Sequence, residues 1–123
     1  EERRRDPRVN EQLSVLIVMM PKTMQTDQIK SRSWKAESVD ISKNGIIVKV
    51  PKAEPEEFHP NDQVLLEIDL EADPGKIRTA GIVRRAMLYE MEKRTTLVAI
   101  KFLGMTETDS KKLNDFVCGE NIV

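Results

Sequence analysis

Gln63-Val64-Leu65-Leu66-Glu67-Ile68-Asp69-Leu70 is the stretch that decides the fold class. Apolar side chains occupy every second position from Val64 to Leu70, which is the period of a strand with one buried face. Five other segments are also rich in β-branched and aliphatic residues and lie between turn signals. The predicted strands are Leu13–Met20, Gln28–Val39, Gly45–Val50, Gln63–Leu70, Lys76–Met87 and Thr95–Leu103. Because no helix is predicted between them, an antiparallel sandwich or barrel is favoured over a parallel α/β sheet.

The end of the chain predicts one helix, at about Glu107–Cys118, with Thr106 or Thr108 as its N-cap. Its apolar stripe at helical spacing consists of Leu113, Phe116 and Val117. Such an amphipathic helix is suited to close the open end of a small barrel. The opposite end of the chain is highly polar and contains Pro7, so residues 1–12 are expected to form an arm and residues 13–123 a single domain.

Composition and charge argue against several classes of protein. The chain has 123 residues, and its 20 Lys and Arg against 21 Asp and Glu give a net charge of -1, so no global field attracts DNA or RNA. The apolar run Val15–Met20 is too short to cross a bilayer, so no membrane insertion is expected. The chain has one cysteine, Cys118, and one histidine, His59, so an internal disulfide cannot form and a zinc site is not expected. A single cysteine is consistent with the expected location in the cytoplasm.

Catalysis has little support in the sequence. His59 lies in a proline-rich loop, and no nucleophile motif accompanies it. The pair Glu56-Glu57 lies in the same loop and is interpreted as solvated charge. Phosphate-cradling glycine loops of the Walker or dinucleotide type are absent. We therefore expect a binding module that is not an enzyme and that uses no metal or cofactor.

Four arginines give the arm a chemistry of its own: Arg3, Arg4, Arg5 and Arg8. The planar guanidinium group matches phosphate oxygens and also the two acceptors on the Hoogsteen edge of guanine. The arm could therefore bind a nucleotide. Its composition is equally typical of a solvated terminus that is partly neutralised by its own carboxylates.

Asp40-Ile41-Ser42-Lys43-Asn44-Gly45 is the second candidate cluster. Asn-Gly is the preferred pair of a tight type I′ hairpin, and Asp and Ser commonly bond nearby backbone, so a turn explains the segment without a ligand. The functional interpretation is that Asp40 accepts hydrogen bonds from guanine, Ser42 reaches a phosphate or base, and Gly45 lets a flat ligand approach.

Together these clusters resemble the PilZ domain family. The resemblance rests on Arg-x-x-x-Arg at Arg4 and Arg8, followed by Val9, and on Asp-x-Ser-x-x-Gly at Asp40, Ser42 and Gly45. Later stretches, Gly81-Ile82-Val83-Arg84 and Ala99-Ile100-Lys101-Phe102, are also similar to the family. The resemblance implies an all-β fold, a six-stranded antiparallel PilZ-like β-barrel with a C-terminal α-helix. It also implies a bacterial receptor domain that binds the second messenger cyclic di-GMP.

The resemblance further implies a ligand-binding set of Arg3, Arg4, Arg8, Asp40, Ser42 and Gly45. Arg4 and Arg8 would hold phosphates and guanine edges, while Asp40 and Ser42 would bind a guanine from the barrel side. Arg3 is similar to a basic family position that accompanies two intercalated cyclic di-GMP molecules. Binding would order the arm and pass the signal to an unidentified partner protein or domain.

Two other interpretations remain open at this point. The first is a nucleotide-independent adaptor that uses the same barrel to bind protein. The second, a single-stranded RNA binder, is disfavoured because aromatic residues make up only 4% of the chain. Trp34 is interpreted as a packing residue. Either Arg84 or Arg85 would add positive potential if their strand lay beside Asp40, since alternation directs the two side chains to opposite faces.

Overall fold

The strands expected from the sequence are present in the structure, a computed structural model that describes residues 8–9, 12–20, 32–70, 75–90 and 94–119. In β5, Val64 and Leu66 are buried whereas Leu65 is 45% exposed, which is the alternation that the sequence predicts. The elements are β1 (Arg8–Val9), β2 (Ser14–Met19), β3 (Arg32–Ser42), β4 (Gly45–Val50), η1 (Pro55–Glu57, a 3-10 turn), β5 (Gln63–Asp69), β6 (Lys76–Glu90), β7 (Thr95–Leu103) and α1 (Glu107–Gly119).

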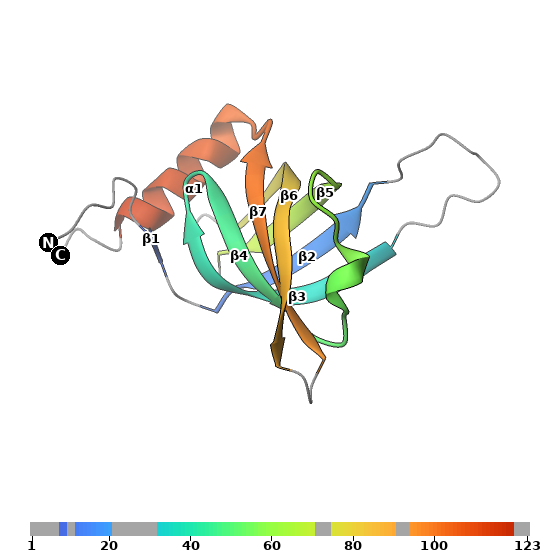
Figure 1. Cartoon of the computed structure of the whole chain (residues 1–123). Coiled ribbons are helices and arrows are strands. Elements are labelled where there is room, and N and C mark those ends of the chain that lie inside the picture. Colours follow the sequence, from blue (N-terminus) through green and yellow to red (C-terminus); the bar gives the residue numbers. More distant parts are fainter. Residues whose placement is uncertain (1–7, 10–11, 21–31, 71–74, 91–93, 120–123) are drawn as a thin grey trace, which may run out of the picture.

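Six antiparallel strands close into a barrel in the order β3-β2-β5-β6-β7-β4, and β4 pairs with β3 to complete the ring (Figure 1). β3 allows this closure because its first half pairs with β2 and its second half pairs with β4. The inward-facing aliphatic side chains fill the interior, and Ile17, Val48 and Val98 are fully buried there. The predicted fold class, a six-stranded antiparallel barrel with a C-terminal helix, is confirmed.

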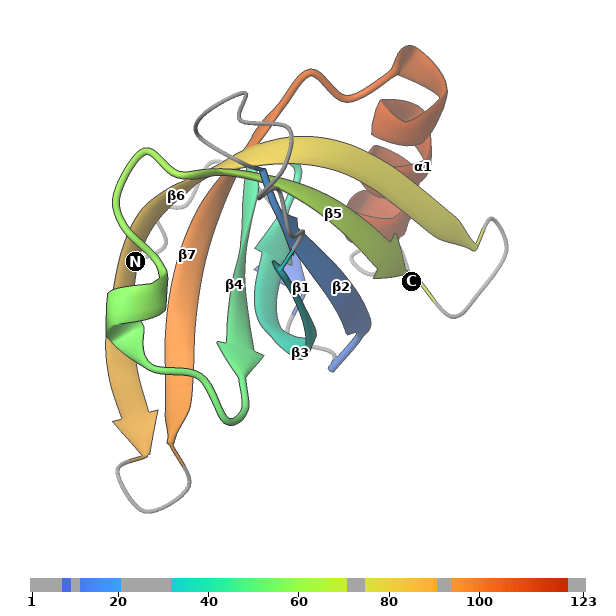
Figure 2. The ribbon, with the colours of Figure 1, turned by 90° about the vertical axis from the view of Figure 1, so that its right-hand side faces the viewer.

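The helix α1 covers one end of the barrel, beside β6, β1 and β3 (Figure 2). Its apolar stripe explains this position, because Leu113 and Val117 are each only 1% exposed. Of the two proposed caps, Thr106 is the one used: its Oγ1 accepts a hydrogen bond of 3.1 Å from the Asp109 amide. Within the described residues, no helix is long and apolar enough to cross a membrane.

Three local features differ from the sequence-based expectation. A two-residue strand, β1, forms at Arg8–Val9, within the segment that the sequence predicts to be an arm without strands. The strand predicted at Gln28–Val39 continues to Ser42, while its first residues, 28–31, lie outside the described residues. The type I′ turn at Asn44-Gly45 is not formed, because β4 already begins at Gly45 and neither residue has a positive φ.

Candidate ligand-binding site

The last residues of β3 carry the polar motif. Ile41 faces the core and is fully buried, whereas Asp40 is half-buried and Ser42 is 4% exposed. Residues i and i+2 share a face of a strand, so Asp40 and Ser42 flank the buried Ile41 on the same side of the sheet. The Ser42 hydroxyl accepts a hydrogen bond of 3.3 Å from the Asn44 amide, which links the motif to the turn.

A β-bulge adjusts the position of this motif. The register of β3 against β4 pairs Ser38 with Val48 but Asp40 with Ile47, so one residue of β3 is extra between them. An extra residue shifts the alternation and increases the local twist. Without the bulge, Asp40 would share the inward direction of the fully buried Ser38. The bulge therefore directs Asp40 away from the interior that Ser38 faces, and the Oδ1 atom of its carboxylate is nevertheless buried.

The strand β1 brings the arm to the same place. Arg8 lies directly opposite Ser42, and Val9 lies opposite Ile41, in an antiparallel pair (Figure 2). A second link follows along the chain, where the Leu13 amide donates to Ser38 Oγ at 2.9 Å and the Ser38 amide donates to the Leu13 carbonyl oxygen at 2.9 Å. Strand pairing thus joins two motifs that are about thirty residues apart in the sequence.

The structure describes the predicted arm residues only in part. The backbone of Arg8 is described, but its side chain is not, and Arg3 and Arg4 lie outside the described residues. β1 pairs with β3 and also contacts α1, so the backbone at the second motif arginine lies beside both elements. Sequence reasoning missed β1, although the single apolar residue Val9 inside a polar segment is a signal that could have suggested it.

Gly45 has a structural role apart from any ligand. It lies opposite Lys101 of β7, and a Cβ built on it would be 2.7 Å from the carbonyl oxygen of Ile100. That separation is too short for any side chain. The glycine therefore allows β4 to approach β7 at the point where the β3–β4 hairpin turns. Its predicted contact with a flat ligand stays a prediction.

Trp34 packs against the core, and His59 is an exposed loop residue. The Trp34 ring centroid is 4.7 Å from that of the buried Phe58, and the interpretation of Trp34 as a packing residue is confirmed. The guanidinium carbon of Arg32 lies 5.2 Å from the centre of the same indole ring. His59 is an exposed loop residue whose amide donates to Asp62 Oδ2 at 2.9 Å.

The condition under which Arg84 or Arg85 would contribute to the site is not met, and the expectation that their side chains point to opposite faces was wrong. Their strand, β6, pairs with β5 and β7 and does not lie beside Asp40. Both side chains are exposed, because a register shift between Val83 and Arg85 interrupts the alternation of β6. Neither arginine therefore belongs to the candidate site at β3.

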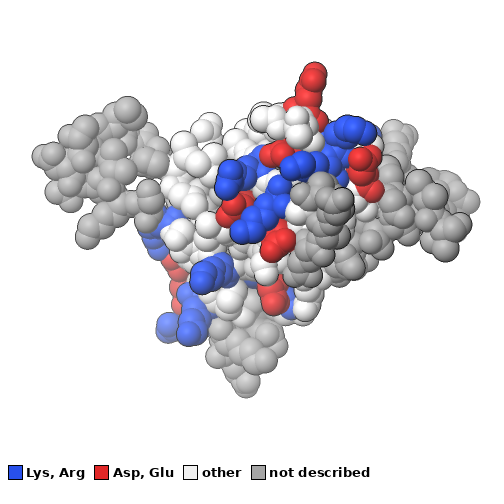
Figure 3. Space-filling model, turned by 180° about the vertical axis from the view of Figure 1, so that it is seen from behind, with Lys and Arg blue, Asp and Glu red and all other residues white. Residues whose placement is uncertain are grey.

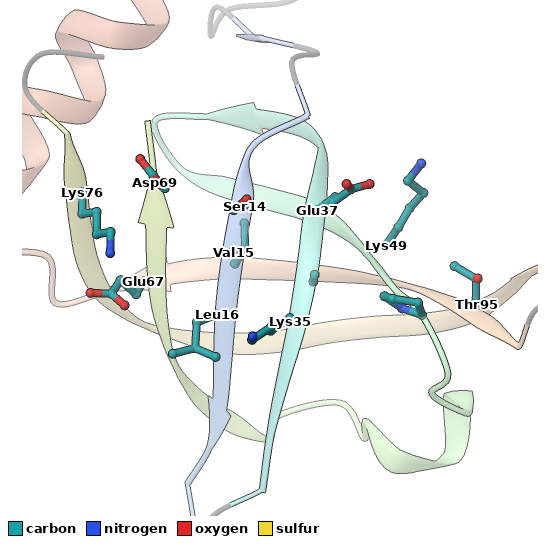
Figure 4. Close-up of a pocket in the computed structure, with 12 residues that line it drawn as sticks. Ser14, Val15, Leu16, Lys35, Glu37, Lys49, Glu67, Asp69, Lys76 and Thr95 are labelled. Atoms are coloured by element: carbon teal, nitrogen blue, oxygen red, sulfur yellow. The ribbon is translucent and has the colours of Figure 1, made fainter. Parts of the chain in front are cut away.

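A groove away from the motif is lined mainly by β2, β3 and β5, with further residues such as Lys49 of β4, Lys76 of β6 and Thr95 of β7 (Figure 4). Its volume is about 590 Å³, and Asp40 and Ser42 do not line it. Charged side chains of both signs surround it: Lys35, Lys49 and Lys76, with Glu37, Glu67 and Asp69. Because these charges offset one another, the groove has no clear preference for an anion or a cation. Among the described residues, no cluster of His, Cys, Asp or Glu could hold a metal ion.

Comparison with solved structures supports the fold. Bacillus subtilis inhibitor of motility (MotI/DgrA) superposes with a TM-score of 0.72 at 19% identity, over 99% of this chain and 52% of that one. The PilZ domain of YcgR from Escherichia coli, solved with c-di-GMP, superposes with a TM-score of 0.62 at 16% identity, over 96% of this chain and 91% of that one. MrkH in the K. pneumonia MrkH–c-di-GMP complex superposes with a TM-score of 0.62 at 14% identity, over 98% of this chain and 55% of that one.

This chain therefore spans about half the length of MotI and MrkH. No curated protein sequence matches it. The family model for the PilZ domain, in contrast, matches residues 2–119, which include both motifs and all the described strands. The chain belongs to the PilZ domain family.

Proposed function

We propose that this chain is a cyclic di-GMP receptor domain whose ligand lies between the arginine arm and the end of β3. One observation carries the proposal: β1 pairs Arg8 with Ser42, so the two motifs of the sequence share one location. Membership of the PilZ family and the fold shared with YcgR and MrkH, both solved with c-di-GMP, support it. Within this proposal the domain acts by binding and performs no catalysis.

The chemistry of the residues fits this ligand. Cyclic di-GMP has two phosphates, which need cationic donors, and two guanines, which offer ring and amino N–H groups to an acceptor. We assign Arg4 and Arg8 to phosphates and to the Hoogsteen edge of guanine, and the Asp40 carboxylate to the guanine N–H groups. Ser42 adds a hydroxyl beside Arg8. Gly45 holds the hairpin that carries Asp40 and Ser42 close to β7.

The energies are compatible with micromolar binding. Ordering an arm residue on the ligand costs about 1–2 kcal/mol, and a well-formed bidentate arginine contact contributes about 1–3 kcal/mol. Several such contacts, with the Asp40 contribution, offset the ordering of a short arm and leave about -8 kcal/mol for a micromolar complex. We further propose that the surface formed by arm and ligand passes the signal to a partner protein or domain.

Isothermal titration calorimetry with cyclic di-GMP tests the site, with GMP and cyclic AMP as ligand controls. Arg4→Ala and Arg8→Ala should each weaken binding roughly tenfold or more, because each removes a charge-assisted contact. Asp40→Asn should act similarly, since the amide loses one acceptor and adds a donor. Arg5→Ala is the matched control in the same arm and should leave the affinity unchanged. The proposed site would be refuted if the Arg4, Arg8 and Asp40 variants bound cyclic di-GMP with the same affinity as the Arg5→Ala control.

The stoichiometry is a separate prediction of the same titration. We propose that Arg3 supports a second, intercalated cyclic di-GMP molecule, so the wild-type chain should bind two ligands. Arg3→Ala should then reduce the stoichiometry to one while the first binding event remains. One ligand in the wild type would keep the receptor function and contradict the stacked pair. No heat in a folded sample would instead favour a nucleotide-independent adaptor.

A further inference from the structure

Along β4, β6 and β7, Lys and Arg outnumber Asp and Glu, because the single acidic residue in the sequence of these three strands is Glu90 at the end of β6. From Gly45 to Val50, from Lys76 to Tyr89 and from Thr95 to Leu103 the sequence contains no Asp or Glu. The opposite side of the molecule differs, because Lys and Arg alternate there with Asp and Glu (Figure 3). On that side, for example, Arg78 pairs with Glu67 at 3.0 Å. The charges are thus distributed unevenly over the barrel, and Lys49 lies at the border because it also lines the mixed-charge groove beside Glu37.

The strand registers give this face a defined pattern. Arg85, Ala99 and Ile47 lie in one row across β6, β7 and β4, and Met87, Leu97 and Lys49 lie in the next row. Lys101 follows Leu97 and Ala99 on β7 and lies opposite Gly45 and Ile82. We call these two rows with Lys101 the basic-apolar face. Its three cations come from three different strands, and apolar side chains fill the positions between them.

The cations of this face are available to an outside partner. Arg85 and Lys101 are exposed and Lys49 is half-exposed. Within the part of the chain that the structure describes, none of the three takes part in an ion pair. The next carboxylate position is Glu37 of β3, opposite Lys49, at the margin of the face. A carboxylate from outside would therefore meet unpaired positive charge over most of the face.

The apolar positions indicate what kind of anion fits. Met87 is 47% exposed, and Ile47, Leu97 and Ala99 are each partly exposed beside the cations. Nucleic acid would use the cations but would leave the aliphatic side chains uncovered, and for stacking the described part of β6 offers one exposed aromatic residue, Tyr89. A lipid surface is bound by clusters of about 4–8 cations, and this face, with its three cations and the neighbouring exposed Arg84, lies at the lower limit of that range. A protein segment can supply carboxylates and aliphatic side chains together.

The size of the face sets the length of that segment. Strands lie about 4.8 Å apart and successive outward residues about 6.8 Å apart, so the face measures roughly 15 Å in each direction. A standard interface between globular proteins covers about 800 Å² on each partner, which is several times larger. The dimensions fit a short segment of chain.

We propose that the basic-apolar face is a docking surface for a short acidic protein segment that carries aliphatic side chains. This inference goes beyond the proposed function, because the face lies outside the Arg8–Ser42 pair and uses none of the residues assigned to cyclic di-GMP. It would also give a location for the partner contact that we propose above.

Fluorescence anisotropy tests the docking surface with the full chain. The probe is a labelled peptide of alternating Glu and Leu residues, and its partner probe has Gln in place of every Glu. The wild-type chain should bind the Glu peptide at least roughly tenfold more tightly than the Gln peptide. The double variant Arg85→Glu with Lys101→Glu should lose about tenfold in affinity. Its matched control, Lys35→Glu with Lys76→Glu, makes the same charge change at two groove residues outside the basic-apolar face and should bind normally.

A second pair of variants tests the apolar contribution. Met87→Ser should weaken peptide binding, whereas Leu65→Ser, at a residue of similar exposure on β5, should not. Circular dichroism confirms that each variant is folded. Equal losses in a variant and its matched control would overturn the proposal, as would equal binding of the Glu and Gln peptides. Tighter binding to anionic phospholipid vesicles or to duplex DNA than to the Glu peptide would also overturn it. The proposed cyclic di-GMP site is unaffected by any of these results.

Discussion

Replacement of Gly45 by Ala separates the two explanations for this glycine. The new Cβ would lie 2.7 Å from the carbonyl oxygen of Ile100, whereas contacts shorter than 3.4 Å are already tight. This oxygen belongs to the backbone of β7, which is held between β4 and β6, so it cannot rotate away as a side chain would. The strands β4 and β7 must therefore separate by about 0.7 Å at this point.

The expected cost combines two opposing effects. Overpacking of this kind costs about 1–3 kcal/mol, while Ala in place of Gly recovers about 0.4–1 kcal/mol by restricting the unfolded chain. The second effect applies because the φ of Gly45 is not positive. The net loss of unfolding free energy should be about 1–2 kcal/mol, which lowers Tm by about 4–8 °C in a domain of this size. Thermal unfolding followed by circular dichroism measures this loss.

Gly104→Ala is the matched control for loss of stability away from the site. Gly104 has a φ of +61° and no neighbour within 4 Å of a built Cβ, so its cost of about 1–2 kcal/mol comes from backbone strain alone. Both variants should keep their affinity for cyclic di-GMP within about threefold of the wild type, which is under 1 kcal/mol. A Gly45→Ala chain with unchanged Tm and strongly weakened binding would refute the packing explanation. Gly45 would then be required by the ligand.

Three further variants test the elements around the site. Thr106→Ala should lower the free energy of unfolding by about 0.5–2 kcal/mol, because it removes the N-cap of α1. Thr108→Ala should leave this free energy nearly unchanged, and equal effects of the two variants in urea unfolding would contradict the assignment of the cap. Leu113→Ala should lower the free energy of unfolding by about 2–5 kcal/mol, because Leu113 is 1% exposed on the face of α1 that packs against the barrel. A loss below about 1 kcal/mol would show that α1 does not seal the barrel. Arg78→Ala should cost less than about 1 kcal/mol, because its ion pair with Glu67 is 79% exposed on the arginine side; a larger loss in thermal unfolding would reveal a coupled network.

The barrel could be predicted because its signals are local. The alternation from Val64 to Leu70 and the apolar stripe of α1 are periods that burial on one face requires, and both occur in the structure. The bounds of β4 and β7 were predicted without error for the same reason. These elements bury their side chains in a single core, so their sequence patterns agree with the final packing.

The remaining features depend on contacts between distant residues. β1 has only two residues, which is too short for any period, and it exists because β3 offers a pairing edge at Ile41 and Ser42. The bulge before Asp40 and the shift at Arg84 are set by the registers of neighbouring strands, so simple alternation misplaces the side chains that follow. Gly45 resembles a turn residue in the sequence, and only the approach of β7 reveals its packing role.

The central claim is that the arm and the end of β3 hold cyclic di-GMP at one site. A titration of the ¹⁵N-labelled chain with cyclic di-GMP, followed by two-dimensional NMR, tests it most directly. The account predicts that the largest shifts occur at the amides of Arg8, Val9 and Ser42 and their neighbours, because β1 and β3 meet there. The amides of β5, a strand that pairs with neither β1 nor β3, should change little. Large shifts on β5 with none at β1 and β3, or no shifts at saturating ligand, would contradict the account.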